Sequence, residues 1–314
     1  MVIEVKNLTR KYGNFTAVKG VSFNIPKGQI IGLLGHNGAG KTTILKVLTG
    51  FLEATSGDVR IAGMDIKTNR IDIQNKIGYL PENSPLYPEM TVLEYLQYVV
   101  KMRGIPEDQH TQAIKDAIRL TDLQLKAGER ISTLSKGYRQ RVGVAQAIIH
   151  KPEILILDEP TNGLDPTQIL SMRQLIKDLS QHSTVILSTH ILQEVEAICD
   201  RALIIIGGEL VVDSMLSDLQ EQQTLTILLK QEPDQVEELI KGIQGIKGIS
   251  GKALYQGLNQ YDIETDSKDP GIGAKLAKEI VQKGWDLYSL HRHQQNLETV
   301  FKSVNSGAKG ENHV

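Results

Sequence analysis

Cysteine, aromatic side chains and net charge are all scarce in this sequence. Cys199 is the single cysteine among 314 residues, so a disulfide within the chain and a zinc site built from several cysteines are excluded. Lys and Arg total 35 against 37 Asp and Glu, and the aromatic residues are one Trp, nine Tyr and four Phe. Proteins that collect nucleic acid rely on a basic field and on stacking rings, so no nucleic-acid partner is expected.

Long hydrophobic runs are also missing. The longest apolar stretches, at 154–157 and 202–206, fall far short of the roughly 20 residues that cross a bilayer. Residues 1–11 lack the continuous apolar segment of a secretory signal. We therefore expect a protein of the reducing cytosol that meets a membrane only through a partner.

The length and the hydrophobic pattern predict two domains. Hydrophobic residues make up 40% of the chain and charged residues 23%, which is a globular composition. Over residues 1–218, short apolar strands alternate with helical segments, as in a largely parallel α/β sheet. The segments 154–157 and 185–187 are apolar throughout, so both are expected as strands covered on both faces. Alternating residues near the N-terminus predict half-exposed strands beside this sheet, and residues 85–152 are expected to form an inserted helical subdomain.

The pattern restarts in residues 219–305, which we expect to form a small α+β domain. The predicted order is β-α-β-β-α-β, the order of a ferredoxin-like unit. The strands are expected near 225–229, 246–254, 261–265 and 285–290, and the helices near 233–240 and 270–281. A short helix bearing Leu297, Val300 and Phe301 is expected to follow. Residues 306–314 are polar and rich in Gly, and are predicted to be disordered.

One glycine-rich segment matches the pattern G-x-x-x-x-G-K-[ST] between a predicted strand and a predicted helix. Its residues are Gly35, His36, Asn37, Gly38, Ala39, Gly40, Lys41 and Thr42. Such glycines let backbone N–H groups surround phosphates, and the helix points its positive end at them. We expect Lys41 to reach the β- and γ-phosphates and the Thr42 hydroxyl to ligate Mg²⁺.

Two carboxylates end the apolar strand at 154–157. Asp158 and Glu159 therefore lie at the carboxyl end of a strand, where α/β folds place their ligands. Asp158 suits the metal, whereas Glu159 is placed to act as general base on a water that attacks the γ-phosphate. His190 follows the strand at 185–187 and is predicted to donate a hydrogen bond to the γ-phosphate.

Residues 134–141, Leu-Ser-Lys-Gly-Tyr-Arg-Gln-Arg, resemble the signature motif of the ATP-binding cassette (ABC) ATPases, and they lie between the two phosphate-site motifs as in that family. Residues 163–166, which include Asp165, resemble its D-loop. His190 resembles its switch histidine and Tyr12 its adenine-stacking aromatic. The resemblance spans about residues 2–215. It implies a P-loop NTPase (RecA-like) core with an antiparallel β subdomain and a helical signature subdomain.

The resemblance also implies that two copies face each other head to tail, with ATP and Mg²⁺ between them. Ser135 and the backbone of Gly137 would contact the γ-phosphate that residues 35–43 of the other copy hold. Val18 would pack near the ribose. Independently of the family, the signature is expected to open a helix, whose N-terminus attracts anions. The full implied nucleotide set is Tyr12, Val18, Gly35, His36, Asn37, Gly38, Ala39, Gly40, Lys41, Thr42, Thr43, Ser135, Gly137, Asp158 and Asp165.

Three residues depart from the family pattern. Glu82 stands where most members have the Q-loop glutamine. A carboxylate still accepts contacts from Mg²⁺ or water, but it cannot donate and it adds negative charge. By resemblance, Glu82 joins Thr42 and Asp158 as a Mg²⁺ ligand and joins Lys41, Glu159 and His190 as a catalytic residue. Lys136 and Tyr138 replace the usual Gly and Gln of the signature, and contacts with partners are expected to change there.

The motif set resembles exporter-type cassettes that work with a separate membrane permease, including those of gliding motility, multidrug efflux and copper or sodium handling. An extra domain follows such cassettes, as residues 224–304 do here. The implied place is the cytoplasmic face of the inner or plasma membrane. One alternative is a soluble ABC ATPase acting on ribosomes or DNA, although such relatives usually carry two cassettes or a coiled-coil insertion. Another is a nucleotide-gated regulator, which would not need Glu159 as a base.

Overall fold

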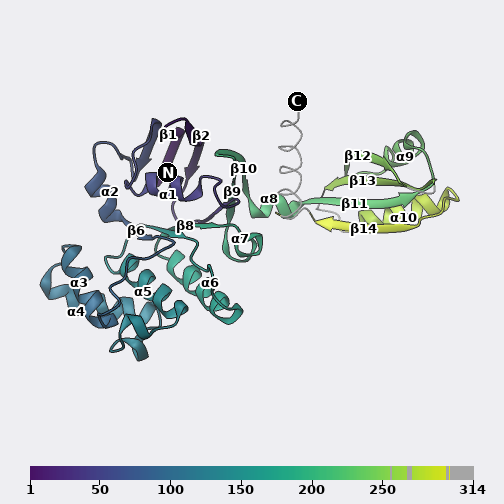
Figure 1. Ribbon diagram of the computed structural model, residues 1–314. Helices are drawn as coiled ribbons and strands as arrows, with labels where there is room; N and C mark the ends of the chain where they lie inside the picture. The colour runs from purple at the N-terminus through teal and green to yellow at the C-terminus, as the bar shows by residue number, and fades with distance from the viewer. Residues whose placement is uncertain (255–256, 267–270, 295–296, 298–314) are drawn as a thin grey trace. The chain divides into compact units, whose positions relative to one another are not determined.

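The chain folds into two units, Met1–Ser214 and Met215–Val314. The computed structural model describes residues 1–254, 257–266, 271–294 and 297 (Figure 1). The expected helix with Val300 and Phe301 and the expected disordered tail at 306–314 lie outside the described residues. Leu297 is described, and its side chain is buried.

A six-stranded sheet with the order β10-β9-β3-β8-β7-β6 forms the centre of the first unit (Figure 1). Its strands are β3 (Ile30–Leu34), β6 (Ile77–Leu80), β7 (Ile154–Asp158), β8 (Thr184–Thr189), β9 (Arg201–Ile206) and β10 (Glu209–Met215). The pairs from β9 to β6 are parallel. Every residue of β3, β7 and β8 is buried, which accounts for the apolar segments 154–157 and 185–187 within β7 and β8.

Helices follow these strands as the sequence predicts. They are α1 (Lys41–Leu48) after β3, α6 (Pro166–Ser180) after β7 and α7 (Leu192–Ile198) after β8, while α2 (Arg70–Lys76) precedes β6. Because consecutive parallel strands need such crossovers, the carboxyl ends of β3, β7 and β8 meet at one edge of the sheet. The predicted parallel α/β arrangement is confirmed, and that edge is where the candidate site lies.

An antiparallel sheet with the order β2-β1-β4-β5 shares the core of the first unit. Its strands are β1 (Ile3–Tyr12), β2 (Phe15–Ile25), β4 (Ser56–Ile61) and β5 (Met64–Asp65). Buried residues of β1 and β2, such as Ile3 and Val21, pack in one hydrophobic cluster with Leu45 of α1 and Ile156 of β7. This shared cluster fixes the antiparallel sheet beside the loop that precedes α1.

A helical part lies between β6 and β7. It holds α3 (Val92–Met102), α4 (Glu107–Leu120) and α5 (Lys136–Ile148), with short 3₁₀ turns at Gln124–Lys126 and Ile131–Thr133. Thr91 and Glu94 form a capping box that starts α3, and Ser135 caps α5. These helices have a hydrophobic cluster of their own, which includes Leu96, Ile114 and Val142.

The second unit has the predicted β-α-β-β-α-β order and an antiparallel sheet ordered β12-β13-β11-β14. After α8 (Leu216–Glu221) come β11 (Gln222–Leu229), α9 (Pro233–Ile240), β12 (Ile246–Ala253), β13 (Asn259–Asp266), α10 (Ile272–Gln282) and β14 (Ser289–Gln294). The predicted last strand at 285–290 is therefore misplaced. Trp285 and Leu287 pack against the core from a loop, and pairing with β11 starts only where Ser289 meets Leu228.

Candidate functional site

The glycine-rich loop joins β3 to α1 and encloses the Lys41 side chain. Gly40 has a φ of 108°, and a Cβ there would lie 2.6 Å from the Ala17 carbonyl oxygen, so only glycine fits. The Lys41 ammonium donates to the carbonyl oxygens of Gly35, at 2.6 Å, and His36, at 3.3 Å. A buried cation is thus held inside the loop at the positive end of a helix.

A cleft of about 580 Å³ opens over this loop, a size suited to a small-molecule ligand. It brings together residues from the β1–β2 hairpin, the loop before α1, the segment after β6, and the segments after β7 and β8. The lining residues are Tyr12, Phe15, Ala17, His36, Asn37, Gly38, Gly40, Lys41, Thr42, Thr43, Glu82, Glu159, Asn162 and His190.

Asp158 is the last residue of β7, and one of its two carboxylate oxygens accepts hydrogen bonds. Its Oδ1 accepts from the hydroxyls of Thr42, at 3.3 Å, and Ser188. Its Oδ2 is buried and, within the part of the chain described, has no hydrogen-bond partner. Burial raises the pKa of this carboxyl, because the charged form is poorly solvated, while the bonds from Ser188 and Thr42 oppose the rise. An unpaired buried carboxylate oxygen beside a threonine hydroxyl fits a hard cation such as Mg²⁺.

Glu159 lies in a strained backbone conformation that aims its side chain at Lys41. Its φ is 49°, and its N–H donates to both the carbonyl and the hydroxyl oxygen of Ser188, at 3.2 and 3.1 Å. Oε1 lies 3.3 Å from the Lys41 ammonium and Oε2 lies 2.9 Å from His190 Nδ1. The carboxylate is 8% exposed, so it is held between two partners with little contact with solvent.

His190 lies at the cleft rather than in the core, with its side chain 39% exposed. Its Nδ1 contacts the acceptor oxygen of Glu159 and so carries a proton, which leaves Nε2 to accept from a ligand in the cleft when the ring is neutral and to donate to one when the ring is protonated. Glu82 is exposed at the cleft, and the Asn162 amide donates to it at 3.4 Å. Two carboxylates, from Glu82 and Glu159, therefore line the cleft with Lys41, and the buried Asp158 precedes Glu159 at the end of β7.

The two residues predicted to hold the base and sugar are placed differently. Tyr12 lines the cleft, is 43% exposed and has the Arg10 guanidinium 4.6 Å from its ring centroid. Val18 does not reach the cleft. Its side chain is fully buried in the hydrophobic cluster, because the strand turns it inward, and Ala17 lines the cleft instead.

The signature residues lie away from this cleft. Ser135 is exposed at the start of α5 and its Oγ accepts from the Tyr138 N–H at 3.4 Å. Gly137 packs on Gln168 of α6, which Asp165 caps by accepting from the Gln168 N–H at 2.9 Å. A separate hollow of about 330 Å³ lies here, lined by Asp122, Ser135, Gly137, Tyr138, Arg141, Leu164, Thr167, Gln168, Ser171 and Met172. One chain thus presents its phosphate loop and its signature in two different concavities.

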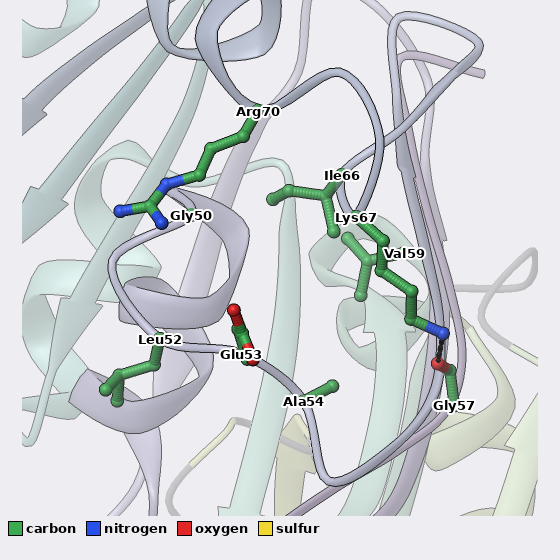
Figure 2. Close-up of a pocket in the computed structure, with 9 residues that line it drawn as sticks. All are labelled: Gly50, Leu52, Glu53, Ala54, Gly57, Val59, Ile66, Lys67 and Arg70. Atoms are coloured by element: carbon green, nitrogen blue, oxygen red, sulfur yellow. Dashed lines mark hydrogen bonds between the residues drawn. The ribbon is translucent and has the colours of Figure 1, made fainter.

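A further hollow of about 260 Å³ lies beyond the C-terminal end of α1 and contains none of the predicted site residues (Figure 2). Its lining residues are Gly50, Leu52, Glu53, Ala54, Gly57, Val59, Ile66, Lys67 and Arg70. The Lys67 ammonium is already engaged, with the Gly57 carbonyl at 3.0 Å and the Asp58 carboxylate at 3.2 Å. Arg70 extends toward Gly50 in this view.

Sequence reasoning missed several residues that shape the site. Ser188 and Asn162 contact the predicted carboxylates, and Phe15 and Ala17 line the cleft. Ser188 follows a predicted central strand directly, at the same sheet edge as Asp158, and that adjacency was the signal that could have found it. Within the described chain, no helix combines the length and apolar composition needed to span a membrane.

A strand, a glycine loop enclosing a lysine, and two carboxylates at the end of another strand of the same parallel sheet define a P-loop ATPase. Residues 18–162 match the family described as ABC transporter. The chain is 32% identical over 317 residues to the bacitracin transport ATP-binding protein BcrA of Bacillus licheniformis, covering 98% of this chain and 99% of that one. It is 30% identical over 305 residues to the linearmycin resistance ATP-binding protein LnrL of Bacillus subtilis (strain 168), covering 96% and 98%.

Among solved structures, the dimeric MJ0796 ATP-binding cassette in a post-hydrolysis state with ADP and Pi has a TM-score of 0.62 and 26% identity. The match covers 68% of this chain and 98% of that one. The chain therefore belongs to the ATP-binding proteins of ABC transporters. It is the subunit that binds and hydrolyses ATP, and it has an ABC cassette fold with an extra C-terminal β-sheet unit.

Proposed function

We propose that two copies of this chain close around ATP and thereby drive a separate membrane permease that exports its substrate. The observation that carries this proposal is the separation of Ser135 from the phosphate cleft within one chain. The phosphate cleft of one chain contains no residue of its own signature, so a second copy supplies the signature. Asp165 caps α6, and Gly137 of the signature packs on Gln168 in the first turn of that helix.

The hydrolytic residues follow from the contacts in the cleft. Glu159 takes the proton of the attacking water, and Lys41 and His190 hold the Glu159 carboxylate in place. Lys41 also holds the β- and γ-phosphates, and the protonated ring of His190 donates from Nε2 to the γ-phosphate. Thr42, Asp158 and Glu82 would hold Mg²⁺, to which the unpaired Oδ2 of Asp158 is suited. When bound, the ion would neutralise the negative charge that develops on the phosphate oxygens during hydrolysis.

The remaining nucleotide contacts come from the loop and from the β1–β2 hairpin. Tyr12 stacks on adenine, and backbone N–H groups of the loop surround the phosphates. The loop residues in this role are Gly35, His36, Asn37, Gly38, Ala39, Gly40 and Thr43. Ser135 and Gly137 of the second copy complete the γ-phosphate site.

Export and the membrane location rest on the relatives. One is named for bacitracin transport and another for linearmycin resistance, and moving a toxic compound outward explains both names. The chain acts at the cytoplasmic face of the membrane, where ATP is available. Residues 219–305 form a ferredoxin-like accessory domain attached to the cassette of residues 1–218, and its β-α-β-β-α-β order supports this assignment.

The permease partner can be tested by affinity purification of the full chain from detergent-solubilised native membranes. We expect an integral membrane protein to copurify and to raise the ATPase rate of the reconstituted complex. Ser135→Arg is the matched comparison, since it blocks closure but leaves the docking surfaces in place. Recovery of ribosomal proteins or DNA in place of a membrane protein would contradict the proposal.

A further inference from the structure

Glu194 is a buried carboxylate that no step of the proposed reaction uses. It lies in the first turn of α7 and is 2% exposed. Its Oε1 accepts a hydrogen bond from the Thr161 hydroxyl and its Oε2 accepts one from the Thr189 hydroxyl at 2.6 Å. A buried carboxylate is costly unless its oxygens are bonded, and here both are satisfied by hydroxyl groups.

The two threonines belong to two different segments of the site. Thr161 comes two residues after Glu159, and Thr189 comes directly before His190. Both side chains are buried, and the Thr189 hydroxyl also accepts from the Ile191 N–H at 3.1 Å, which fixes the turn around His190. One carboxylate therefore ties the segment that carries the general base to the segment that carries its histidine partner.

Helix α7 gives this carboxylate a rigid support. Val195, the next residue, packs so closely on β3 that a Cβ on Gly32 would lie 2.7 Å from its Cγ1. The helix cannot shift toward the sheet, so the position of Glu194 is set by β3, the strand that also leads into the phosphate loop. The segment with Glu159, the segment with His190 and the phosphate loop are thus all positioned relative to β3.

We propose that Glu194 is a positioning residue for ATP hydrolysis. By holding Thr161 and Thr189, it keeps His190 Nδ1 within 2.9 Å of the Glu159 carboxylate. It does not line the cleft and so acts through these two residues rather than on the nucleotide. The inference rests on the hydrolytic roles proposed above for Glu159 and His190.

The test uses two substitutions that keep side-chain volume. Thr161→Val removes the hydrogen bond to Glu194, and Thr189→Val removes both the bond to Glu194 and the bond accepted from the Ile191 N–H. Both are expected to lower kcat about tenfold or more, with KM and the dissociation constant of a fluorescent ATP analogue within about twofold of the parent. Glu194→Ala is expected to lose more, and Glu194→Gln to recover part of the rate, because an amide oxygen still accepts one hydroxyl.

Thr121→Val is the matched control. Thr121 is equally buried and donates its hydroxyl to the Ala117 carbonyl at 2.7 Å, but it lies in the helical part. It measures the general cost of losing a buried threonine hydrogen bond, and kcat is expected to stay within about twofold. A second readout is the imidazole ¹H–¹³C NMR signal of His190, which is expected to move in Thr189→Val and to stay in place in Thr121→Val.

The outcomes separate this inference from the proposal beneath it. If Glu159→Gln and His190→Ala keep the parent turnover, the hydrolytic roles fail and the positioning role fails with them. If those two variants lose turnover while folded Thr161→Val and Thr189→Val keep the parent kcat and the His190 signal, only the role of Glu194 is overturned. Should Glu194→Ala not fold, the threonine variants alone decide.

Discussion

At the scale of single residues, the Lys41–Glu159 pair dominates the electrostatics of the cleft. Its atoms are 3.3 Å apart and its side chains are 5% and 8% exposed, so solvent screens the interaction poorly. Removing one partner of a buried pair leaves the other charge uncompensated, which costs more than the pair itself is worth. The lysine therefore serves both the bound phosphates and the folded site.

Lys41→Ala is expected to weaken ATP binding by on the order of 100-fold, since a charge-assisted contact to phosphate is lost and the Glu159 carboxylate then repels the nucleotide. Isothermal titration calorimetry with Mg²⁺ and ATP measures the change. Lys46→Ala is the control, because Lys46 lies exposed on the same helix. Equal affinities in the two variants would contradict the placement of Lys41 at the phosphates.

Glu82 lines the cleft together with Glu159, and its charge adds to the burial that raises the pKa of Asp158. Glu82→Gln removes that repulsion, so the affinity for ATP without Mg²⁺ is expected to rise about threefold while half-maximal ATPase needs more Mg²⁺. Glu89→Gln, an exposed change in the same segment, should alter neither quantity. If Glu82→Gln also alters neither, Glu82 does not face the ion or the phosphates.

Much of the site could be predicted residue by residue, because its chemistry follows strand ends. The positions of Lys41, Asp158 and Glu159 follow from a glycine loop and an apolar strand that ends in acids. The hydroxyl contacts of Ser188 and Thr189 were not predicted, since they depend on which strands become neighbours and on side-chain packing. Val18 was misplaced because one residue of register decides whether a strand side chain faces the core or the cleft.

At the scale of elements, the segment just after α5 is joined to β6 by the half-buried imidazole of His150. His150 Nε2 lies 3.2 Å from the Ile77 carbonyl oxygen. Burial, followed by the nearby Arg103 cation, lowers the pKa of His150 to about 4. The folded pKa is below the ordinary value near 6.5, so the neutral ring contributes stability above pH 6.5, and this contribution is lost as the pH falls toward 4.

His150→Gln is expected to remove this pH dependence. Between pH 7 and pH 4 the parent should lose about 3 kcal/mol more unfolding free energy than the variant, because the pKa of His150 is about 4 in the folded state and near 6.5 in the unfolded state. Urea unfolding at a series of pH values measures the difference. His182→Gln, at an exposed site, is the control and should retain the parent slope. Parallel curves for the parent and His150→Gln would show that the ring is not neutralised by burial.

The α5 N-terminus carries the second test at this scale. Ser135→Arg is expected to abolish ATP hydrolysis while keeping ATP affinity within about twofold, because Ser135 lies outside the cleft of its own chain. Loss of the cap costs about 1 kcal/mol of stability, which thermal unfolding will show. Ser132→Arg, exposed just before the signature, is the control. A Ser135→Arg variant that binds ATP poorly would contradict the separation of the two concavities.

Element type was predictable wherever one physical cause set the pattern. The segments 154–157 and 185–187 of the buried strands β7 and β8 are apolar throughout, and a helix follows each strand, as the alternating pattern predicts. The last strand was predicted too early. Trp285 and Leu287 gave the apolar pattern of a strand, but their side chains pack on the core from a loop. Gly284, with a φ of 74°, ends the turn after α10. The bounds of β14 are set by its pairing with β11, a contact between distant parts of the sequence that local pattern does not reveal.

At the scale of the whole molecule, the division into two units was predicted because the strand and helix pattern restarts. Charge gave no sign of the boundary, because it is balanced on both sides. The boundary near residue 214 lies within a few residues of the predicted one. A single chain does not contain a complete ATP site, because its phosphate loop and its signature lie in two different concavities. ATP-driven association of two copies is therefore the central claim.

Size-exclusion chromatography with light scattering on Glu159→Gln tests this claim most directly, since the variant binds ATP but cannot turn it over. Without nucleotide the account predicts one chain of 34.8 kDa. With ATP and Mg²⁺ it predicts twice that mass, and with ADP a return to one chain. A mass that stays at one chain with saturating ATP, or at two chains without nucleotide, would contradict the account.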